Sequence, residues 1–244
     1  MNTNYPLFLP NVVKTFTDFE NVFNDENNRL EETKKAFYVI LSKNYFDKIV
    51  IVDGSNFTIF SVSEIIEIQN TYNVKIEQLA FQQDKSLVDR YGKGNGEMQI
   101  TNFMVENSRL VKEAGGFVKL TPRYFFDNID EVLPKIKKFE NVFFFYYPPI
   151  IRKIKPFVMT ILYKTSLEFY NRQIRESLSE HNKSISGYAE SVFYRQIIKL
   201  SKNGIKVDFP KFSGTSGTTG KKIKNQYMFF RKRFSSIGML CYRF

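Results

Sequence analysis

Cysteine, histidine and tryptophan are almost absent from this chain of 244 residues, which contains one Cys, one His and no Trp. A single cysteine, Cys241, excludes an internal disulfide framework and suits a reducing compartment. One His and one Cys also exclude a zinc site of the usual composition. His181 lies in a polar stretch that we expect to be exposed, so we predict no Ser/His/Asp triad.

Long apolar runs and several familiar motifs are missing as well. The longest apolar run, Val142 to Ile151, is too short to span a bilayer and is interrupted by Pro148 and Pro149. The first thirty residues show no signal peptide, because they lack a continuous apolar segment. No Gly-x-x-x-x-Gly-Lys-Ser/Thr motif supports a P-loop nucleotidase, and no RNP, KH, zinc-finger or helix-turn-helix signature is present.

Positive charge is abundant, and it implies an anionic partner. The formal net charge is +11, from 36 Lys and Arg against 25 Asp and Glu. Residues 221–244 contain basic and aromatic residues and no acid. Basic residues mixed with large apolar ones are typical of a segment that lies at an anionic membrane surface, and a solvated basic terminus is the alternative.

Helical periodicities and apolar runs alternate along the first 150 residues, which predicts an α/β fold with a mostly parallel sheet flanked by helices. We expect the strands at 7–13, 48–52, 74–81, 116–120 and 142–147, and the helices at 28–42, 61–70, 97–112 and 129–138. The following part looks helical at 164–179 and 188–202, and residues 213–222 form a Gly/Ser/Thr-rich segment. A basic tail completes the chain.

The segment 91–123 contains the pattern that most directly indicates a ligand. Gly92, Gly94 and Gly96 surround Lys93, and we expect them to form a loop before a helix that begins at Glu97. The strand at 116–120 then ends on Thr-Pro-Arg. Sheet proteins bind phosphate-bearing ligands with such elements at the carboxyl ends of their strands. A glycine-rich surface turn is the alternative interpretation.

Five stretches occur in an order that resembles a known family. They are Asp53-Gly54-Ser55, the Gly-Lys-Gly-Asn-Gly-Glu segment at 92–97, Phe-Val-Lys-Leu-Thr-Pro-Arg-Tyr at 117–124, the Glu-containing segment 188–194 and the Gly-Ser-rich segment 210–220. Over residues 28–222 the chain resembles bacterial glycosyltransferases with a GT-A-like (Rossmann-like) fold that build capsule and O-antigen polysaccharides. The resemblance implies a nucleotide-sugar donor held across the carboxyl edge of the sheet.

The resemblance and the local patterns together nominate a set of site residues. We predict Glu190 as the general base and Arg123 as the group that stabilises the leaving diphosphate. The predicted donor-binding residues are Arg29, Asp53, Ser55, Lys93, Gly94, Glu97, Lys119 and Thr121. Ser216 and Gly217 are predicted on the acceptor side. For Asp53 a turn role remains open, and for Glu97 an interaction with the helix dipole in the first turn remains open. The alternative for Arg123 is a surface ion pair with Asp127, and for Glu190 and Arg29 it is an exposed helix face.

The metal motif of GT-A enzymes is not found where the resemblance places it. Thr121, Pro122 and Arg123 stand where Asp-x-Asp is expected, and the family's usual Thr-Gly-Arg is changed at Pro122. Because two cations can neutralise a diphosphate, we expect Lys93 and Arg123 to replace a divalent metal. The predicted ligand is therefore a nucleotide sugar, with UDP favoured, and no resident cofactor or metal.

These inferences define an organisation and a function. Residues 1–150 are expected to bind the donor, 151–222 to form a helical acceptor side of the same domain, and 223–244 to form a membrane-associating tail. The predicted enzyme transfers a sugar to a lipid-linked or growing surface glycan, in the cytoplasm at the inner face of the membrane. A nucleotidyltransferase and a non-catalytic nucleic-acid-binding protein are the alternatives, although we expect no nucleic-acid partner.

Overall fold

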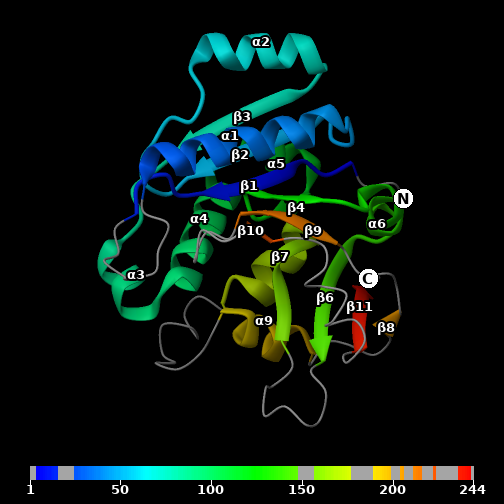
Figure 1. The fold of residues 1–244 in the computed structure, drawn as a ribbon. Coiled ribbons are helices and arrows are strands. Elements are labelled where there is room, and N and C mark those ends of the chain that lie inside the picture. The colour runs from blue at the N-terminus through cyan, green and yellow to red at the C-terminus, as the bar shows by residue number, and fades with distance from the viewer. Residues whose placement is uncertain are drawn as a thin grey trace.

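The chain folds around one large mixed sheet with helices on both faces (Figure 1). A computed structural model describes residues 4–15, 25–147, 157–176, 189–198, 204–205, 211–215, 222–223 and 236–242. All statements below concern these residues.

Eight strands form the main sheet, in the order β3-β2-β1-β4-β7-β6-β11-β8. Neighbouring strands are parallel from β3 to β4 and antiparallel from β4 to β8, so that β7 and β11 run against the other six. The bounds are β1 Leu7–Asn11, β2 Lys48–Asp53, β3 Lys75–Ala80, β4 Gly116–Leu120, β6 Asn141–Tyr147, β7 Phe157–Ser166, β8 Gly204–Ile205 and β11 Ser236–Tyr242.

Different helices cover the two faces of this sheet. One hydrophobic core packs α1, α2 and α6 against one face, and a second core packs α4, α5, α7, the π-helix η1 and α9 against the other. The bounds are α1 Glu26–Ser42, α2 Val62–Tyr72, α3 Lys85–Tyr91, α4 Lys93–Asn107, α5 Arg109–Ala114, α6 Ile129–Lys137, α7 Leu167–Phe169, η1 Tyr170–Ile174 and α9 Ala189–Ile198.

Side-chain alternation along the buried strands decides which residues meet which helices. On β4, Val118 and Leu120 enter the core beneath α1 and α6, whereas Phe117 enters the core beneath α4 and α9. Lys119 shares the face of Phe117 and is completely buried. A charged residue is thus directed into the layer between the sheet and α4.

The parallel strands end at one edge, where the loops after β1, β2 and β4 lie together. Asn11, the last residue of β1, pairs with Asp53, the last residue of β2. On the other side of β1, Phe8 pairs with Lys119. This register places the residues after Leu120 beside the end of β1.

A second, three-stranded sheet holds the segment after β4. Strand β5 (Tyr124–Phe126) pairs with β9 (Phe212–Thr215), which pairs with β10 (Lys222–Ile223). Arg123 precedes β5 in the left-handed region, with φ of 68°. Its carbonyl accepts a hydrogen bond from the Thr215 amide at 3.0 Å. Gly214 is required there, because a Cβ on it would lie 1.9 Å from the Arg123 carbonyl oxygen.

The predicted fold class is confirmed: the molecule is α/β, and its sheet with helices on both faces is consistent with a GT-A-like, Rossmann-like arrangement. The nine strands and helices predicted up to residue 150 form, with two differences at one place. Residues 93–96 belong to the first turn of α4 and not to a loop, and the predicted helix 97–112 is broken at Ser108, whose side chain caps α5.

The second half differs more from expectation. The segment predicted as a helix from residue 164 begins with the last residues of β7, and most of that strand was not predicted. Residues 236–242, predicted as part of the basic tail, pair with β6 inside the main sheet. None of the helices in the described ranges is long and apolar enough to cross a membrane.

Candidate functional site

Three cations converge at the carboxyl edge of the parallel strands. Arg29 comes from the first turns of α1, Lys93 is the first residue of α4, and Arg123 follows β4. We call these residues the cation cluster. Electrostatic coupling connects Lys93 with both arginines, and Arg29 with Arg123. The structure thus brings together three of the predicted site residues, which are far apart in the sequence.

Arg123 is buried without an ionic partner among the described residues. Its side chain is 7% exposed, and its Nη1 donates to the Asn11 Oδ1 at 3.2 Å. Within the described part of the chain, the buried Nε has no hydrogen-bond partner. Glu32 is electrostatically coupled to Arg123, but its carboxylate accepts a 2.6 Å hydrogen bond from Thr215. A buried guanidinium with an unused donor is a costly arrangement unless an anion completes it.

The other two cations increase this excess of positive charge. Burial and the Arg123 charge lower the pKa of Arg29 to about 9, although the nearby Asp53 opposes this change. Partial burial and then the charges of Arg29 and Arg123 lower the pKa of Lys93. Arg29 donates from its Nε and Nη2 to the Val12 carbonyl, at 2.9 and 2.5 Å. An anion at this place would remove the mutual repulsion of the three groups.

Asp53 and Ser55 lie near the cation cluster and hold the surrounding backbone in place. The Asp53 carboxylate is completely buried and accepts from the backbone amides of Val13, Ser55 and Phe57. It also accepts from the Asn11 side chain at 3.1 Å and from the Ser55 hydroxyl at 2.5 Å. Burial raises the pKa of Asp53, while these hydrogen bonds act in the opposite direction. Asp53 therefore fixes the loops after β1 and β2, and it has no surface with which to touch a donor directly.

A second group of predicted residues gathers around Lys119. We call Glu97, Lys119 and Glu190 the carboxylate cluster. The Lys119 ammonium donates to the Glu97 Oε1 at 2.6 Å, to the Thr121 hydroxyl at 2.8 Å and to the Thr160 carbonyl. The Thr160 hydroxyl donates to the Glu190 Oε1 at 3.4 Å. All three N–H groups of Lys119 are thus used inside the protein, so the prediction that it binds the donor directly has no geometric support.

The two glutamates occupy different environments. Glu97 is 32% exposed and forms the ion pair with Lys119. Burial raises the pKa of Glu190, and the neighbouring Glu97 charge raises it further, whereas Lys119 and the Thr160 hydrogen bond lower it. Burial lowers the pKa of Lys119, against the attraction of both carboxylates. A carboxyl group with a raised pKa is suited to exchange a proton near neutral pH.

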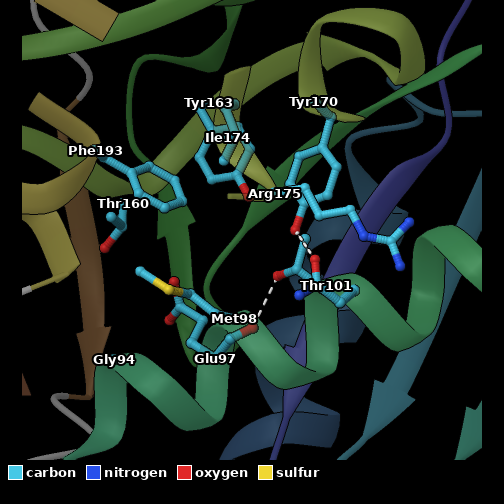
Figure 2. Close-up of a pocket in the computed structure, with 11 residues that line it drawn as sticks. Gly94, Glu97, Met98, Thr101, Thr160, Tyr163, Tyr170, Ile174, Arg175 and Phe193 are labelled. Carbon is cyan, nitrogen blue, oxygen red and sulfur yellow. Dashed lines mark hydrogen bonds between the residues drawn. The ribbon is translucent and has the colours of Figure 1, made fainter. Parts of the chain in front are cut away.

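A small pocket adjoins the carboxylate cluster. Figure 2 shows Glu97, Met98 and Thr101 on α4 below Tyr163 and Tyr170, with Thr160 and Phe193 on one side. Gly94 lies at the end of the pocket nearest the cation cluster, because it follows Lys93 in α4. The first turns of α4 therefore connect the two clusters.

Sequence reasoning missed residues that organise both clusters. Asn11 accepts from Arg123 and Thr33 and donates to Asp53, and Thr160 contacts both Lys119 and Glu190. An Asn directly after a buried apolar run was the available signal for Asn11. Thr160 lies on β7, which was not predicted. Ser216 and Gly217, the predicted acceptor residues, lie outside the described residues.

Comparisons with known proteins do not assign the chain to a family. No family model matches it, and no curated protein matches it. Solved structures with a similar arrangement include a 4-diphosphocytidyl-2C-methyl-D-erythritolsynthase from Anaerococcus prevotii, with 10% identity, a TM-score of 0.45 and coverage of 94% of this chain and 96% of that one. HddC from Yersinia pseudotuberculosis has 9% identity and a TM-score of 0.30, over 68% of this chain and 78% of that one. At such values neither likeness identifies an activity.

Proposed function

We propose that this protein is a transferase that binds the diphosphate of a nucleotide sugar at the cation cluster and moves the sugar to an acceptor hydroxyl. One observation carries the proposal: Arg123 is buried, lacks an ionic partner among the described residues and has an unused Nε donor. Guanidinium groups bind phosphate oxygens with charge-assisted, often bidentate, hydrogen bonds. Lys93 and Arg29 add the charge that a diphosphate requires.

The chemistry assigned to the two clusters is complementary. In an inverting transfer, Glu190 would accept the proton of the acceptor hydroxyl while the hydroxyl oxygen forms a bond to C1 of the sugar. The bond from C1 to the phosphate oxygen breaks, and its electron pair leaves with the nucleoside diphosphate. The cation cluster would stabilise the negative charge that grows on that leaving group. Glu190 lies in α9 and the cations lie at the start of α4, which places acid-base and leaving-group functions on different elements.

The finer assignment rests on the resemblance of the sequence to capsule and O-antigen glycosyltransferases. The acceptor would be a lipid-linked or growing surface glycan, and the enzyme would work at the inner face of a membrane. The basic residues between 221 and 233 would favour an anionic surface. The resemblance aligns Arg123 with the Asp-x-Asp motif of the family, so metal-independent transfer is part of the proposal.

A nucleotidyltransferase is the second candidate, because the same cations suit a nucleoside triphosphate. It would release pyrophosphate, whereas the proposed glycosyltransferase releases a nucleoside diphosphate. A non-catalytic nucleic-acid-binding protein is the third, and its polynucleotide affinity would fall steeply with salt. Product identity and salt dependence therefore separate the three functions.

The test is a thermal-shift panel of UDP-, GDP- and CMP-sugars and of nucleoside triphosphates, each with Mn²⁺ or with EDTA. A ligand that binds only the folded state raises the melting temperature by mass action. We expect one nucleotide-diphosphate sugar to stabilise the chain in EDTA, and the effect to disappear in Arg123→Met but not in Arg109→Met. Arg109 is an exposed arginine with only a surface ion pair to Glu113. Stabilisation by triphosphates alone would favour the nucleotidyltransferase, and stabilisation by no nucleotide would contradict both enzymes.

A further inference from the structure

Lys119 is the most completely enclosed charge in the described part of the second core. Its side chain has no exposed surface, and its ammonium lies 5.9 Å from the centroid of the Tyr163 ring. Glu97, Thr121 and Thr160 accept hydrogen bonds from its three N–H groups. A lysine so placed cannot reach a substrate, yet replacing it by an apolar residue would be the simpler way to fill a core.

The position of Lys119 between two glutamates gives it a different use. Glu97 contacts it directly, and Glu190 is connected to it through the hydroxyl and carbonyl of Thr160. These groups come from α4, β4, β7 and α9, so four elements must be assembled before the charges meet. We propose that Lys119 is a positioning residue that keeps Glu97 and Glu190 unequal: Glu97 neutralises the ammonium, and Glu190 remains the carboxyl group that exchanges a proton with the substrate.

The charges that face Glu190 support this division. Burial raises the pKa of Glu190 and a backbone hydrogen bond lowers it; after these larger effects, Glu97 of α4 raises the pKa and Lys119 of β4 lowers it. From β7, Thr160 donates a hydrogen bond, and Tyr163 is held neutral because burial raises its pKa. Arg175, which lines the adjoining pocket beyond η1, is paired with Glu106. Glu97 and Lys119 are therefore two opposing charges that act on the proton affinity of Glu190.

Two substitutions should move the titration of Glu190 in opposite directions. Glu97→Gln keeps an acceptor for Lys119 and removes the negative neighbour, so the titration should move to lower pH. Lys119→Met removes the positive neighbour, so it should move to higher pH. A merely structural role of Lys119 predicts no such opposition. The role of Glu190 as a base rests on the proposed function, but the opposite shifts do not.

The first measurement is ¹³C NMR titration of the chain labelled at the glutamate carboxyl carbons, with the Glu190 signal identified by its loss in Glu190→Gln. Opposite shifts in Glu97→Gln and Lys119→Met support the proposal. Shifts in one direction, or none, overturn it. If Lys119→Met does not fold, the Glu97→Gln titration decides: a shift to lower pH supports the proposal, and an unchanged midpoint overturns it.

The second measurement is the pH profile of kcat/KM with the donor found in the nucleotide panel. The limb that rises with pH should follow the NMR midpoint in each variant, and kcat of Lys119→Met at neutral pH should fall by about 100-fold. Rescue by Lys119→Arg is expected to be partial, because the charge is kept and the geometry is not. If the NMR shifts are opposite but the chain has no transfer activity, the role of Lys119 in the carboxylate cluster is supported and the proposed function is refuted. If the chain is active but neither substitution changes the pH profile, the role of Lys119 is refuted and the proposed function is not.

Discussion

The cation cluster and the carboxylate cluster lie at the same end of α4 and treat buried charge in opposite ways. Lys119 is fully buried and uses every N–H group, with a carboxylate in direct contact. Arg123 is nearly as buried, and among the residues that the structure describes it has one neutral acceptor and an unused Nε. Burial alone therefore does not reveal the role of a cation. A buried cation whose N–H groups all have acceptors organises its neighbours, whereas one with an unused N–H group indicates a ligand.

A substitution in the three-stranded sheet should disturb the backbone conformation of Arg123. Gly214→Ala places a Cβ 1.9 Å from the Arg123 carbonyl oxygen, at a residue with φ of 136°. We expect a loss of about 4 kcal/mol in the free energy of unfolding, from overpacking and backbone strain together. Urea denaturation measures it. The control is Gly115→Ala, also at positive φ but with no atom within 4 Å of the added Cβ, which should cost about 1 kcal/mol. Equal losses in the two variants would refute the role given to Gly214.

The carboxylate cluster can be broken at its centre. Lys119→Met leaves Glu97 without its counter-ion and should lower the free energy of unfolding by about 3 kcal/mol, at the lower end for a broken buried pair because Glu97 is 32% exposed. Lys85→Met breaks an exposed pair with Asp89 and should cost less than about 1 kcal/mol. Thermal and urea unfolding of both variants provide the comparison. A cost for Lys119→Met no larger than that for Lys85→Met would contradict the structural part of this account.

Arg123→Met should show the reverse behaviour. Removing a buried cation without an ionic partner should leave the free energy of unfolding unchanged or higher, because the desolvation cost disappears. Affinity for the nucleotide-sugar donor should fall by about 2 kcal/mol, or roughly 30-fold, for the loss of charge-assisted hydrogen bonds. Calorimetry and thermal unfolding on one preparation measure both quantities. A destabilised protein with unchanged affinity would show that Arg123 is structural.

Lys93 should contribute less, because its side chain is exposed at the start of α4. Lys93→Met is expected to reduce donor affinity by about 1 kcal/mol at low ionic strength, with a smaller effect at high salt. Binding isotherms at two salt concentrations test this. An effect of Lys93→Met that does not depend on salt would argue against an electrostatic role.

Proton uptake provides the smallest and most specific signal. The pKa of Arg29 is lowered to about 9 and that of Lys93 is lowered by its cationic neighbours. A bound diphosphate would raise both pKa values. Because the pKa of Arg29 is about 9, binding near pH 9 should take up protons, and binding near pH 7 should take up fewer because Arg29 is already charged there. Calorimetry in buffers of different ionisation enthalpy counts these protons. Proton release near pH 9 would contradict the placement of the diphosphate.

The sequence predicted the parallel half of the molecule better than the rest. The buried strand β2 was recognisable because its continuous apolar run ends on a turn cluster that begins at Asp53. Strand β4 was predicted as a short strand that ends before Thr-Pro-Arg. Gly94 and Gly96 were interpreted as a loop, but they lie in α4, where Gly96 admits the Gln83 side chain at 2.7 Å from its ideal Cβ. Close packing, and not a ligand, explains that glycine.

The antiparallel half depends on contacts that periodicity does not report. Strand β7 lies between β4 and β6 in the sheet. Strand β6 directly precedes it in the chain, whereas β4 is distant in sequence. Strand β11 lies in a segment whose charge resembles a surface tail, yet it pairs with β6. All members of the two clusters were among the predicted site residues, but the sequence did not indicate which of them lie together. Asn11 and Thr160, which connect the members, were not predicted.

The affinity that a diphosphate adds to a nucleoside tests the central claim most directly. Calorimetry would compare UDP with uridine on the wild-type chain in EDTA, and on the variant with Arg123→Met and Lys93→Met together. GDP with guanosine and CDP with cytidine would follow if uridine compounds do not bind. We predict that the diphosphate binds the wild-type chain at least about tenfold more tightly than its nucleoside, and that the double variant loses this difference. A diphosphate that binds no better than its nucleoside, or a preference that survives in the double variant, would contradict the cation cluster as the phosphate site.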